Sequence, residues 1–586
     1  MNMKNIFHPT VFSMILKKYL VGWAMLLVFE LFALPFSMSR TLLTGASLTD
    51  NVLESLCFPI FPFVGGIMAA IFSFRYIMEK DAQTAMHVLP VKKGTLFTSS
   101  CLSGFFILIM IEFITAVLGL IVGVRDDGFF IPVIVWWFLF RLLEIVFFYS
   151  LAVLCNVFAG RSAAAFAFYM IWNFFFAGVF LVLGVLLEIS VFGYTSSGNL
   201  NSLAINLSPL LGIFEHVNGY TTISDNEVSA ITGVEVHGTG YVAICAVIGI
   251  LLLIAAYFSY KIRPNESARD VVSIFFAKPM FLYGMGIFGG LCGGFLVYTF
   301  FYGYTIGNEY GLSGVLFIMM LIVSIICFMA AQMILKRTWR LKPKNLIGAF
   351  GSVAVIAIVV GLFKFDAFGF VSYLPLQDKV SSVYIDFSTN GGMDIHVESD
   401  DPEVIEEAIG LHSSIIENEG YIKENTKANH YTDGDESYVF FEGTISYIAK
   451  NGKNTARNYY IYLDEDDFNV EGTLEWQVKE FITDKKVLDL AVSYYTDRDD
   501  IGNVSYYKNT DDGSEQEYQF SSAEYEKLFD ALKKDVNADP LPFFFYLENT
   551  SYEEGDINED TDFDTMYIMV PSEAKNLKEF IEKTVS

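Results

Sequence analysis

Three charged residues stand inside stretches of the chain that are otherwise apolar: Glu112, Arg141 and Glu144. Glu112 lies near the middle of the apolar run 99–123, and Arg141 lies in the first half of the run 131–157. At a rise of ~1.5 Å per residue, both lie about 15–17 Å from the turn between the runs, so a helical hairpin can bring them together. Charged side chains are costly in hydrocarbon and should face the interior of a helix bundle. They predict a structural ion pair, which we favour because the charges can neutralise one another, or a substrate contact.

A second candidate site is an acidic segment near the C-terminus, "DINEDTDFD". Its acidic and amide side chains occupy alternate positions, as they do in calcium-binding loops: Asp556, Asn558, Asp560, Asp562 and Asp564. Thr561 and Tyr567 stand where such a loop needs Gly and Glu. A solvated acidic loop is therefore the favoured interpretation, and we expect neither a metal centre nor a cofactor.

Enzyme chemistry finds little support in the remaining residues. The one Gly-Lys pair, Gly452–Lys453, is followed by Asn454, so the chain has no phosphate-binding loop of its own. Ser313 in "GLSG" would need a histidine base within the membrane, and none of the seven histidines lies in an apolar run. The histidines also lack metal-ligand spacing, so we expect a protein that is not an enzyme.

These residues must be positioned by membrane helices. Residues up to about 365 contain nine apolar runs long enough to cross a bilayer. They are 18–39, 55–77, 99–123, 131–157, 163–190, 239–260, 277–301, 311–335 and 345–365. A possible amphipathic helix, in "NIFHPTVFSMILKKYL", precedes the first run. All six cysteines lie in or beside these runs, which suits packing better than disulfides or metal binding.

Charge divides the chain into two pieces. From residue 371 onward there are 48 Asp and Glu against 17 Lys and Arg, whereas the preceding residues carry a small positive excess. In the membrane part, 17 Lys and Arg fall in one set of alternate loops, and the other set holds Arg40 and Arg125, with Lys364 at the tip of the last run. Positive loops face the cytoplasm, so we expect the N-terminus inside and the acidic C-terminal domain outside, in the bacterial cytoplasmic membrane.

Strand-like segments and amphipathic helices alternate after residue 366. "SSVYIDFSTNGGMDIHVES" is followed by "DPEVIEEAIGLHSSIIEN", and three further units can be drawn, one with an Asn-Gly turn and one with a Ser-x-x-Glu capping box. The fold class expected is a polytopic α-helical membrane protein with an extracellular α+β domain of antiparallel sheet, built from possible ββα repeats. The expected divisions are 1–270, a six-span block with the N-terminal amphipathic helix; 271–365, three added spans; and 366–586, the acidic domain.

The loop after the second run carries a short pattern, "LPVKKGTLFTSSCLSG", in which an apolar turn precedes two lysines. This pattern, the six-span block and the long outer segment before the sixth span resemble the permease half of ABC-2-type exporters. The three extra spans and the outer domain are most similar to the larger permeases of Bacillus-type bacteria grouped with acetoin-utilisation transporters.

The resemblance implies a permease subunit of an ATP-binding-cassette exporter that works as a homo- or heterodimer in the lipid bilayer. It also implies that separate ATPase subunits dock on the coupling loop, formed by Met86, His87, Val88, Leu89, Pro90, Lys92 and Lys93. An ordinary positive-inside loop remains the alternative for this segment. For the whole protein, the alternative is a sensor or resistance protein whose outer domain binds a peptide or envelope ligand without transport. No nucleic-acid partner is expected.

Overall fold

A computed structural model describes the chain in two units. The longer described stretches are 7–88, 91–126, 128–195, 199–223, 231–264, 270–275, 277–302, 314–340, 344–367, 369–389, 394–429 and 438–487. Shorter ones are 501–509, 515–521, 547–549, 564–568 and 575–585, with eight further single or paired residues between 490 and 535. The first unit comprises residues 1–184, 198–297 and 318–357, and the second comprises 185–197, 298–317 and 358–586. Each unit is described by itself.

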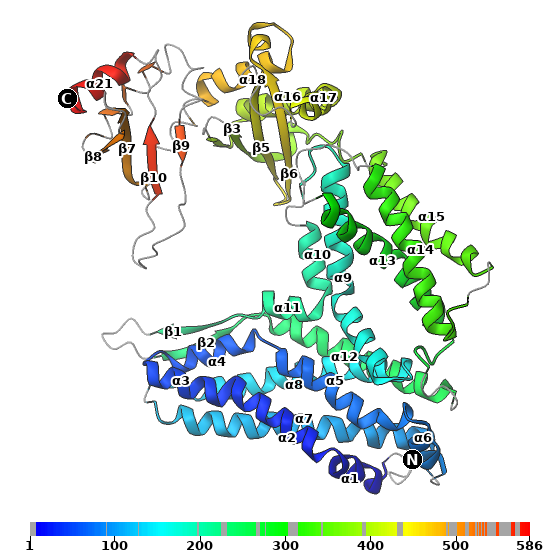
Figure 1. The fold of residues 1–586 in the computed structure, drawn as a ribbon. Helices are drawn as coiled ribbons and strands as arrows, with labels where there is room; N and C mark the ends of the chain where they lie inside the picture. The colour runs from blue at the N-terminus through cyan, green and yellow to red at the C-terminus, as the bar shows by residue number, and fades with distance from the viewer. Residues whose placement is uncertain are drawn as a thin grey trace. The chain divides into compact units, whose positions relative to one another are not determined.

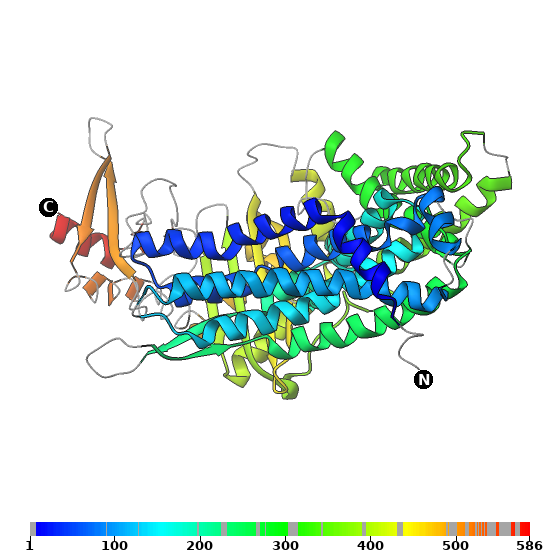
Figure 2. The same ribbon diagram turned by 90° about the horizontal axis from the view of Figure 1, so that it is seen from below.

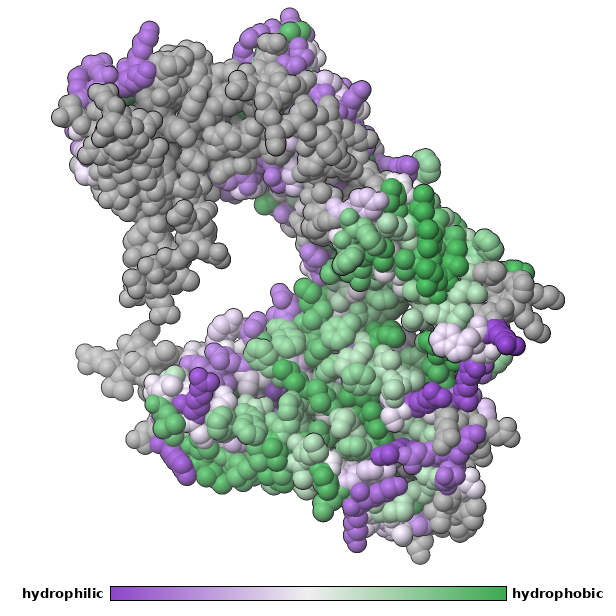
Figure 3. All heavy atoms as spheres, in the orientation of Figure 1, coloured by the Kyte–Doolittle hydropathy of each residue, from purple (hydrophilic) through white to green (hydrophobic). Residues whose placement is uncertain are grey.

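The described part of the chain contains nine helices that are long and apolar enough to cross a membrane. They are Leu20–Thr44, Ile60–Ile77, Lys93–Gly123, Pro132–Phe158, Ser162–Glu188, Thr239–Ile262, Ala277–Tyr302, Gly314–Lys336 and Ile347–Lys364. Apolar side chains also gather on the outer surface of the helices, as helices that face lipid require (Figure 3). The chain is therefore a multi-pass membrane protein, and the nine predicted spans are confirmed.

The first span is one continuous helix with a widened turn in its middle. It is built from α2 (Leu20–Leu31), the π-helical η2 (Phe32–Phe36) and α3 (Ser37–Thr44). Pro35 lies within η2 and cannot donate a backbone hydrogen bond, which accounts for a local departure from α-helical geometry. The short helix α1 (Pro9–Lys18) precedes this span and buries Val11 and Ile15, which are one turn apart.

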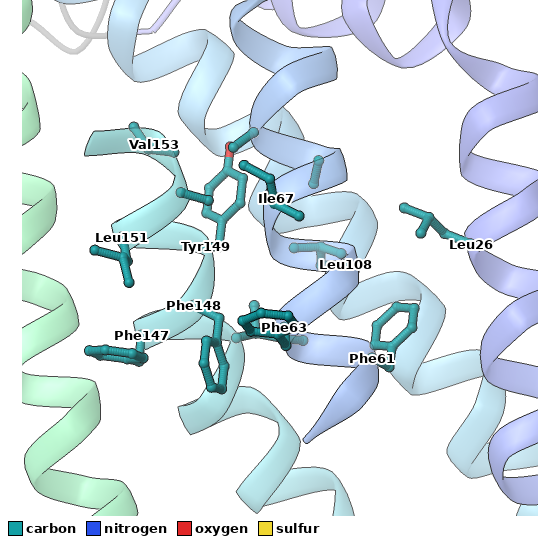
Figure 4. Close-up of a cluster of buried hydrophobic side chains, with 14 of the residues drawn as sticks. Leu26, Phe61, Phe63, Ile67, Leu108, Phe147, Phe148, Tyr149, Leu151 and Val153 are labelled. Atoms are coloured by element: carbon teal, nitrogen blue, oxygen red, sulfur yellow. The ribbon is translucent and has the colours of Figure 1, made fainter. Parts of the chain in front are cut away.

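The core of the first unit lies between α5 (Ile60–Phe74), α7 (Lys93–Gly123) and α8 (Pro132–Phe158). Phe63 of α5 packs edge-on against Phe148 of α8, with ring centroids 5.7 Å apart (Figure 4). Close approach of these helices depends on Gly66, where an added Cβ would lie 3.1 Å from the backbone of Phe148. Helix α12 (Thr239–Ile262) also packs on α8, where an added Cβ at Gly249 would lie 2.7 Å from the Phe147 Cα. Helices α2, α7 and α8 run side by side in both views (Figures 1 and 2).

The long segment before the sixth span contains two short helices. These are α10 (Asn199–Leu207) and α11 (Pro209–His216), which follow α9 (Ser162–Ser190). The hairpin of β1 (Gly219–Ile223) and β2 (Ile231–Val236) was not predicted. Helix α4 (Leu48–Leu56) lies beside this hairpin, since an added Cβ at Gly219 would be 2.7 Å from Leu53.

Small residues join α13 (Ala277–Tyr302) to α14 (Gly314–Lys336) and α15 (Lys344–Lys364). An added Cβ at Gly290 would lie 2.6 Å from the Ser324 Cβ, and one at Gly294 would lie 2.5 Å from the Met320 Cα. The Ser324 and Ser352 hydroxyls are 3.1 Å apart and connect the other two helices. Glycines four residues apart on α13 therefore lie where this helix packs closely against its neighbours.

The second unit contains an antiparallel four-stranded sheet in the order β4-β3-β5-β6. Its strands are β3 (Val380–Thr389), β4 (Asp394–Ser399), β5 (Tyr438–Ala449) and β6 (Asn454–Asp464), with helices α16 (Pro402–Glu417), α17 (Glu419–Asn429) and α18 (Leu474–Thr483). Val383, Ile385 and Phe387 alternate along β3 and are buried, as period-two patterning predicts. The β5–β6 hairpin turns at the predicted Asn-Gly, where Gly452 has φ +79°.

A second sheet has the order β8-β7-β10-β9. It is formed by β7 (Ile501–Asn509), β8 (Glu515–Phe520), β9 (Leu547–Asn549) and β10 (Asp564–Ile568), and α21 (Lys575–Val585) follows. The expected antiparallel pairing holds for β7 with β8 and for β9 with β10, but β7 and β10 are parallel. Both sheets are built from two pairs of adjacent strands. In the first sheet the two central strands, β3 and β5, are each the earlier strand of their pair, and they run antiparallel. In the second sheet the central strands are β7, the earlier strand of its pair, and β10, the later strand of its pair, and they run parallel.

Candidate functional site

Four ionisable side chains from three spans lie buried in the first unit. Glu30 comes from α2, Glu112 from α7, and Arg141 and Glu144 from α8. The three carboxylates have no exposed surface, and Arg141 is 3% exposed. The predicted intramembrane charge cluster therefore lies inside the bundle, and Glu30 is an additional member of it.

Arg141 makes the closest contacts in the cluster. Its Nη1 donates to Glu144 Oε2 at 2.8 Å, and its Nη2 donates to the Ser55 carbonyl of α4 at 2.7 Å. The guanidinium carbon also lies 5.5 Å from the centre of the Trp137 ring. The ion pair is thus formed within α8, between residues three apart, rather than across the α7–α8 hairpin.

Glu30 and Glu112 are close to these charges but bond to none of them. Glu112 lies near enough to Glu30, Arg141 and Glu144 for their charges to interact. Among the described residues, none donates a hydrogen bond to either oxygen of Glu30 or Glu112. With all four groups ionised, the cluster carries three negative charges and one positive charge, which leaves two carboxylates without an ionic partner.

Glu30 was not among the candidate residues selected from the sequence. The structure adds it, because the helix that begins at Leu20 continues through η2 and α3 to Thr44, and Glu30 falls in its middle part. The depth of Glu30 from Thr44, the distal end of its span, is comparable with the depth of Glu112 from Gly123. Comparing such depths across spans is the signal that could have identified it.

A cavity of about 280 Å³ opens beside the cluster. Its lining includes Glu30 and Arg141 together with polar groups from the start of α3 and from α4: Ser37, Asn51, Glu54 and Ser55. The Ser37 hydroxyl and the Asn51 side chain bond to one another at 3.1–3.2 Å. Aromatic side chains complete the wall: Phe29, Phe58, Phe61 and Trp137. The cavity therefore combines a buried charged group with apolar surface, which is the usual make-up of a small-molecule site.

The predicted coupling loop is helical over its first half. The turn η3 (Arg75–Ile77) ends the second span, and α6 (Lys80–Val88) follows and contains Met86, His87 and Val88. Leu89 and Pro90 lie outside the described residues, as do the side chains of His87 and Val88. On α6 the side chains of Lys80, Asp81 and Thr84 are exposed.

The two lysines after α6 differ in their surroundings. Lys92 precedes the first turn of α7 and is exposed. Lys93 is half-buried, and its ammonium group donates to the Arg263 carbonyl at 3.4 Å. Lys92 is therefore the better placed of the two to contact a partner, whereas Lys93 contributes to packing within the chain.

Arg263 joins the ends of three spans next to α6, a role that its sequence position did not reveal. It follows α12 directly, is 4% exposed, and donates from Nη2 to the Ile77 carbonyl at 3.1 Å. Its Nη1 donates to the carbonyls at the end of α8, at 2.8–3.2 Å: Asn156, Val157 and Ala159. The guanidinium thus satisfies terminal carbonyls that the helices cannot satisfy themselves. We call this group of contacts the Arg263 clamp.

Comparison with known proteins identifies no relative. No protein-family model, no curated protein and no solved structure matches the chain. The functional conclusion therefore depends on the residues and geometry described above.

The weak calcium candidate falls almost entirely outside the described residues. Asp556, Asn558, Asp560 and Asp562 are not described, and Asp564 is the first residue of β10. Within the described ranges, no three His, Cys, Asp or Glu side chains are grouped to hold a metal ion.

In the second unit, His412 is buried between two tyrosines. Its Nδ1 lies 3.2 Å from the Tyr447 hydroxyl and its Nε2 lies 2.7 Å from the Tyr459 hydroxyl. Tyr447 donates to the Ala408 carbonyl, so it accepts from Nδ1–H, and Tyr459 donates to the unprotonated Nε2. Burial, with a smaller contribution from the positive charge of Arg457, lowers the pKa of His412 to about 3. The imidazole is therefore neutral and structural.

The residues that follow α9 pair with the edge strand β6. Tyr194 forms a bridge with Arg457, and the Asn458 N–H donates to the Gly193 carbonyl at 3.1 Å. Gly193 has φ +69°, and an added Cβ would lie 2.3 Å from the Tyr459 ring. Residues 193 and 194, which belong to the second unit, are thus joined to its first sheet by backbone pairing.

Proposed function

We propose that the chain is the permease subunit of an ABC-2-type ATP-binding-cassette transporter, an exporter that a separate ATPase subunit powers. The observation that carries this proposal is that the residues on both sides of α6 contact Arg263: Ile77 before the helix and Lys93 after it. A positive-inside loop needs only charge to hold topology, whereas this loop forms a helix next to the joined ends of three spans.

Two of the three spans that the clamp joins also line the candidate site. The second span carries Ile77 at one end and Phe61 near the other, and α8 carries Val157 near one end and Arg141 in the opposite half. A movement of α6 can therefore reach the cavity through two continuous helices and their common arginine. In the proposed mechanism, ATP binding by the partner moves α6, and the clamp passes this movement to the walls of the cavity.

The proposal includes an orientation and a dimer. The end that holds α1 and α6 faces the cytoplasm, because the lysines and arginines of the loops gather there. The acidic C-terminal domain lies outside. A second permease subunit, identical or related, completes the transport path, since the resembled exporters work as dimers.

Partner capture tests the proposal. The tagged chain is purified from its native membrane in mild detergent, and co-purified proteins are searched for a Gly-x-x-x-x-Gly-Lys-Ser/Thr phosphate-binding loop. A triple change of exposed side chains, Lys80, Thr84 and Lys92→Ala, should remove the ATPase, while the exposed control Lys278→Ala should retain it. Absence of any such ATPase, or its retention by the triple variant, contradicts the proposal and favours a sensor without transport.

Arg263→Gln separates docking from transmission. This change removes charged hydrogen bonds to four carbonyls but leaves the exposed face of α6 intact. We expect the ATPase to remain bound. Addition of ATP should alter hydrogen exchange in α5 and α8 of the wild-type complex and should no longer do so in the variant. An unchanged ATP response in the variant would show that the clamp does not transmit movement.

A further inference from the structure

We infer that the cavity beside Glu30 binds a cationic amphiphile, a molecule with an ammonium group and an apolar chain, and that Glu30 holds the ammonium group. The assignment of this molecule as transport substrate rests on the proposed function, but the binding itself does not. Three features of the site support the inference independently of one another.

The first feature is an unbalanced charge. Arg141 is bonded to Glu144 and to the Ser55 carbonyl, and it adds one positive charge to three carboxylates. Glu30 has no exposed surface, and among the described residues its two oxygens have no hydrogen-bond donor. A buried carboxylate that stays ionised requires a donor or a counter-charge, and an ammonium group supplies both.

The second feature is the composition of the wall around Glu30. Phe29, Phe61 and Trp137 offer apolar and aromatic surface, and Ser37 and Asn51 add hydrogen-bonding groups on the α3 and α4 side. A small inorganic cation would leave this aromatic surface unused, and a neutral lipid chain would leave Glu30 unpaired. A molecule that is charged at one end and apolar at the other satisfies both parts.

The third feature is the helix that carries Glu30. The π-helical turn η2 begins two residues after Glu30, and its residues Ala33 and Leu34 line the cavity. π-Helical turns inside α-helices are concentrated at functional sites, because they displace side chains that a regular helix would pack. Pro35 lies within this turn and cannot donate a backbone hydrogen bond, which favours the turn without any ligand.

A thermal-shift experiment on the purified full chain in lipid nanodiscs tests the inference. The probe is n-octylammonium, and n-octanol at the same concentration is the matched neutral control. We expect octylammonium to raise the unfolding temperature by about 3 °C or more at saturation, as ligand binding to the folded state does, and octanol to have no comparable effect.

Two variants assign the effect to the carboxylate. Glu30→Gln keeps the shape of the side chain but removes its charge, and it should abolish the octylammonium shift. Asp50→Asn, a similar change in α4 outside the cavity lining, should preserve it. If Glu30→Gln unfolds, protection of Glu30 from a hydrophobic carbodiimide by octylammonium, mapped by mass spectrometry in the wild type, replaces the variant.

The outcomes distinguish this inference from the proposed function. Equal shifts with octylammonium and octanol, or an octylammonium shift that survives Glu30→Gln, would overturn the cation site. If the Glu30→Gln variant cannot be used, the carbodiimide experiment decides. Protection of Glu30 by octylammonium that is no better than protection by octanol would also overturn the cation site, and protons would then neutralise Glu30. The thermal-shift measurement needs no ATPase. If the chain captures no ATPase but octylammonium still raises its unfolding temperature specifically, the cation site stands and the proposed transporter function is contradicted.

Discussion

Arg141 shows how a charge is accommodated among membrane helices. It is buried with a carboxylate of its own helix, a carbonyl of α4 and an aromatic ring around it. Pairing between residues three apart requires little rearrangement, because the helix itself fixes the spacing. This pair supports the structural interpretation of Arg141 and Glu144, while Glu30 and Glu112 are left for another role.

Removal of one partner of this pair should be more damaging than removal of both. Arg141→Met leaves the buried carboxylate of Glu144 without its counter-charge, and we expect a loss of about 3–5 kcal/mol in stability. The double variant Arg141→Met with Glu144→Leu should recover most of that loss. The check is the temperature at which half of each purified variant remains monodisperse by gel filtration. Equal losses in the single and double variants would contradict the role of the pair.

His412 should make the second unit less stable in mildly acidic solution. Its pKa is about 3 in the folded chain against 6.5 ordinarily, so the unfolded state binds the proton more readily. The contribution of neutral His412 to the free energy of unfolding is complete above about pH 6.5 and is lost as the pH falls toward 3. Between pH 7 and pH 5 the free energy of unfolding should fall by about 2 kcal/mol.

The full chain is unfolded with urea at pH 7 and at pH 5. At each urea concentration a short hydrogen-exchange pulse, given at one fixed pH, reports the unfolded fraction through the peptides of α16. The non-titrating variant His412→Gln is the control for all other ionisable groups. We expect its loss of stability between the two pH values to be smaller than that of the wild type by about 2 kcal/mol. Equal losses would show that His412 does not titrate in this range.

At the scale of elements, glycines determine how closely the last three spans approach one another. An added Cβ at Gly294 would meet backbone and side-chain atoms of Met320 at 2.5–2.8 Å, whereas at Gly284 it would meet nothing within 4 Å. Backbone cannot move aside as a flexible side chain can, so overpacking at Gly294 has to displace a helix.

Gly294→Ala should therefore destabilise the packing of α13 on α14, by about 1–3 kcal/mol. Gly284→Ala should be neutral or slightly stabilising, because alanine is favoured over glycine in a helix and has free space here. Thermal unfolding of both variants in the same detergent checks this prediction. Equal midpoints for the two variants would show that the glycine face of α13 does not set the distance to α14.

The coupling segment and the clamp belong to the same scale. The pattern of the sequence predicted a special role for residues 86–93, and the structure adds that α6 is a helix next to a buried arginine far along the chain. No local signal marks Arg263, since a basic residue after a span is ordinary. Its role depends on the carbonyls that the fold brings within 3.2 Å of it.

At the scale of the whole molecule, the charge difference between loops predicts its orientation. Cysteines introduced one at a time into a background without the native six test this. Thr84→Cys on α6 should react with an impermeant maleimide only after the membrane is opened, and Asp400→Cys, exposed beside α16, should react in intact cells. If the cysteines at positions 84 and 400 were both labelled in intact cells, or both unlabelled, an odd number of membrane crossings between these two positions would be contradicted.

The sequence by itself determined the nine spans, most of their boundaries within a few residues, and the acidic strand-rich C-terminal part. Hydropathy, charge and turn chemistry are local properties, and a bilayer imposes the length of each span on the chain directly. The Asn-Gly turn of the β5–β6 hairpin was predictable for the same reason.

Only the tertiary structure decided which buried charges meet. Glu30 joins the cluster from a helix that continues through a π-turn, and Glu112 has no bonded partner among the described residues because Arg141 pairs with Glu144. The parallel pairing of β7 with β10 and the attachment of residues 193–194 to β6 were equally invisible in the sequence. Each depends on contacts between segments far apart in the chain, where the direction and neighbours of an element follow from packing rather than from its own residues.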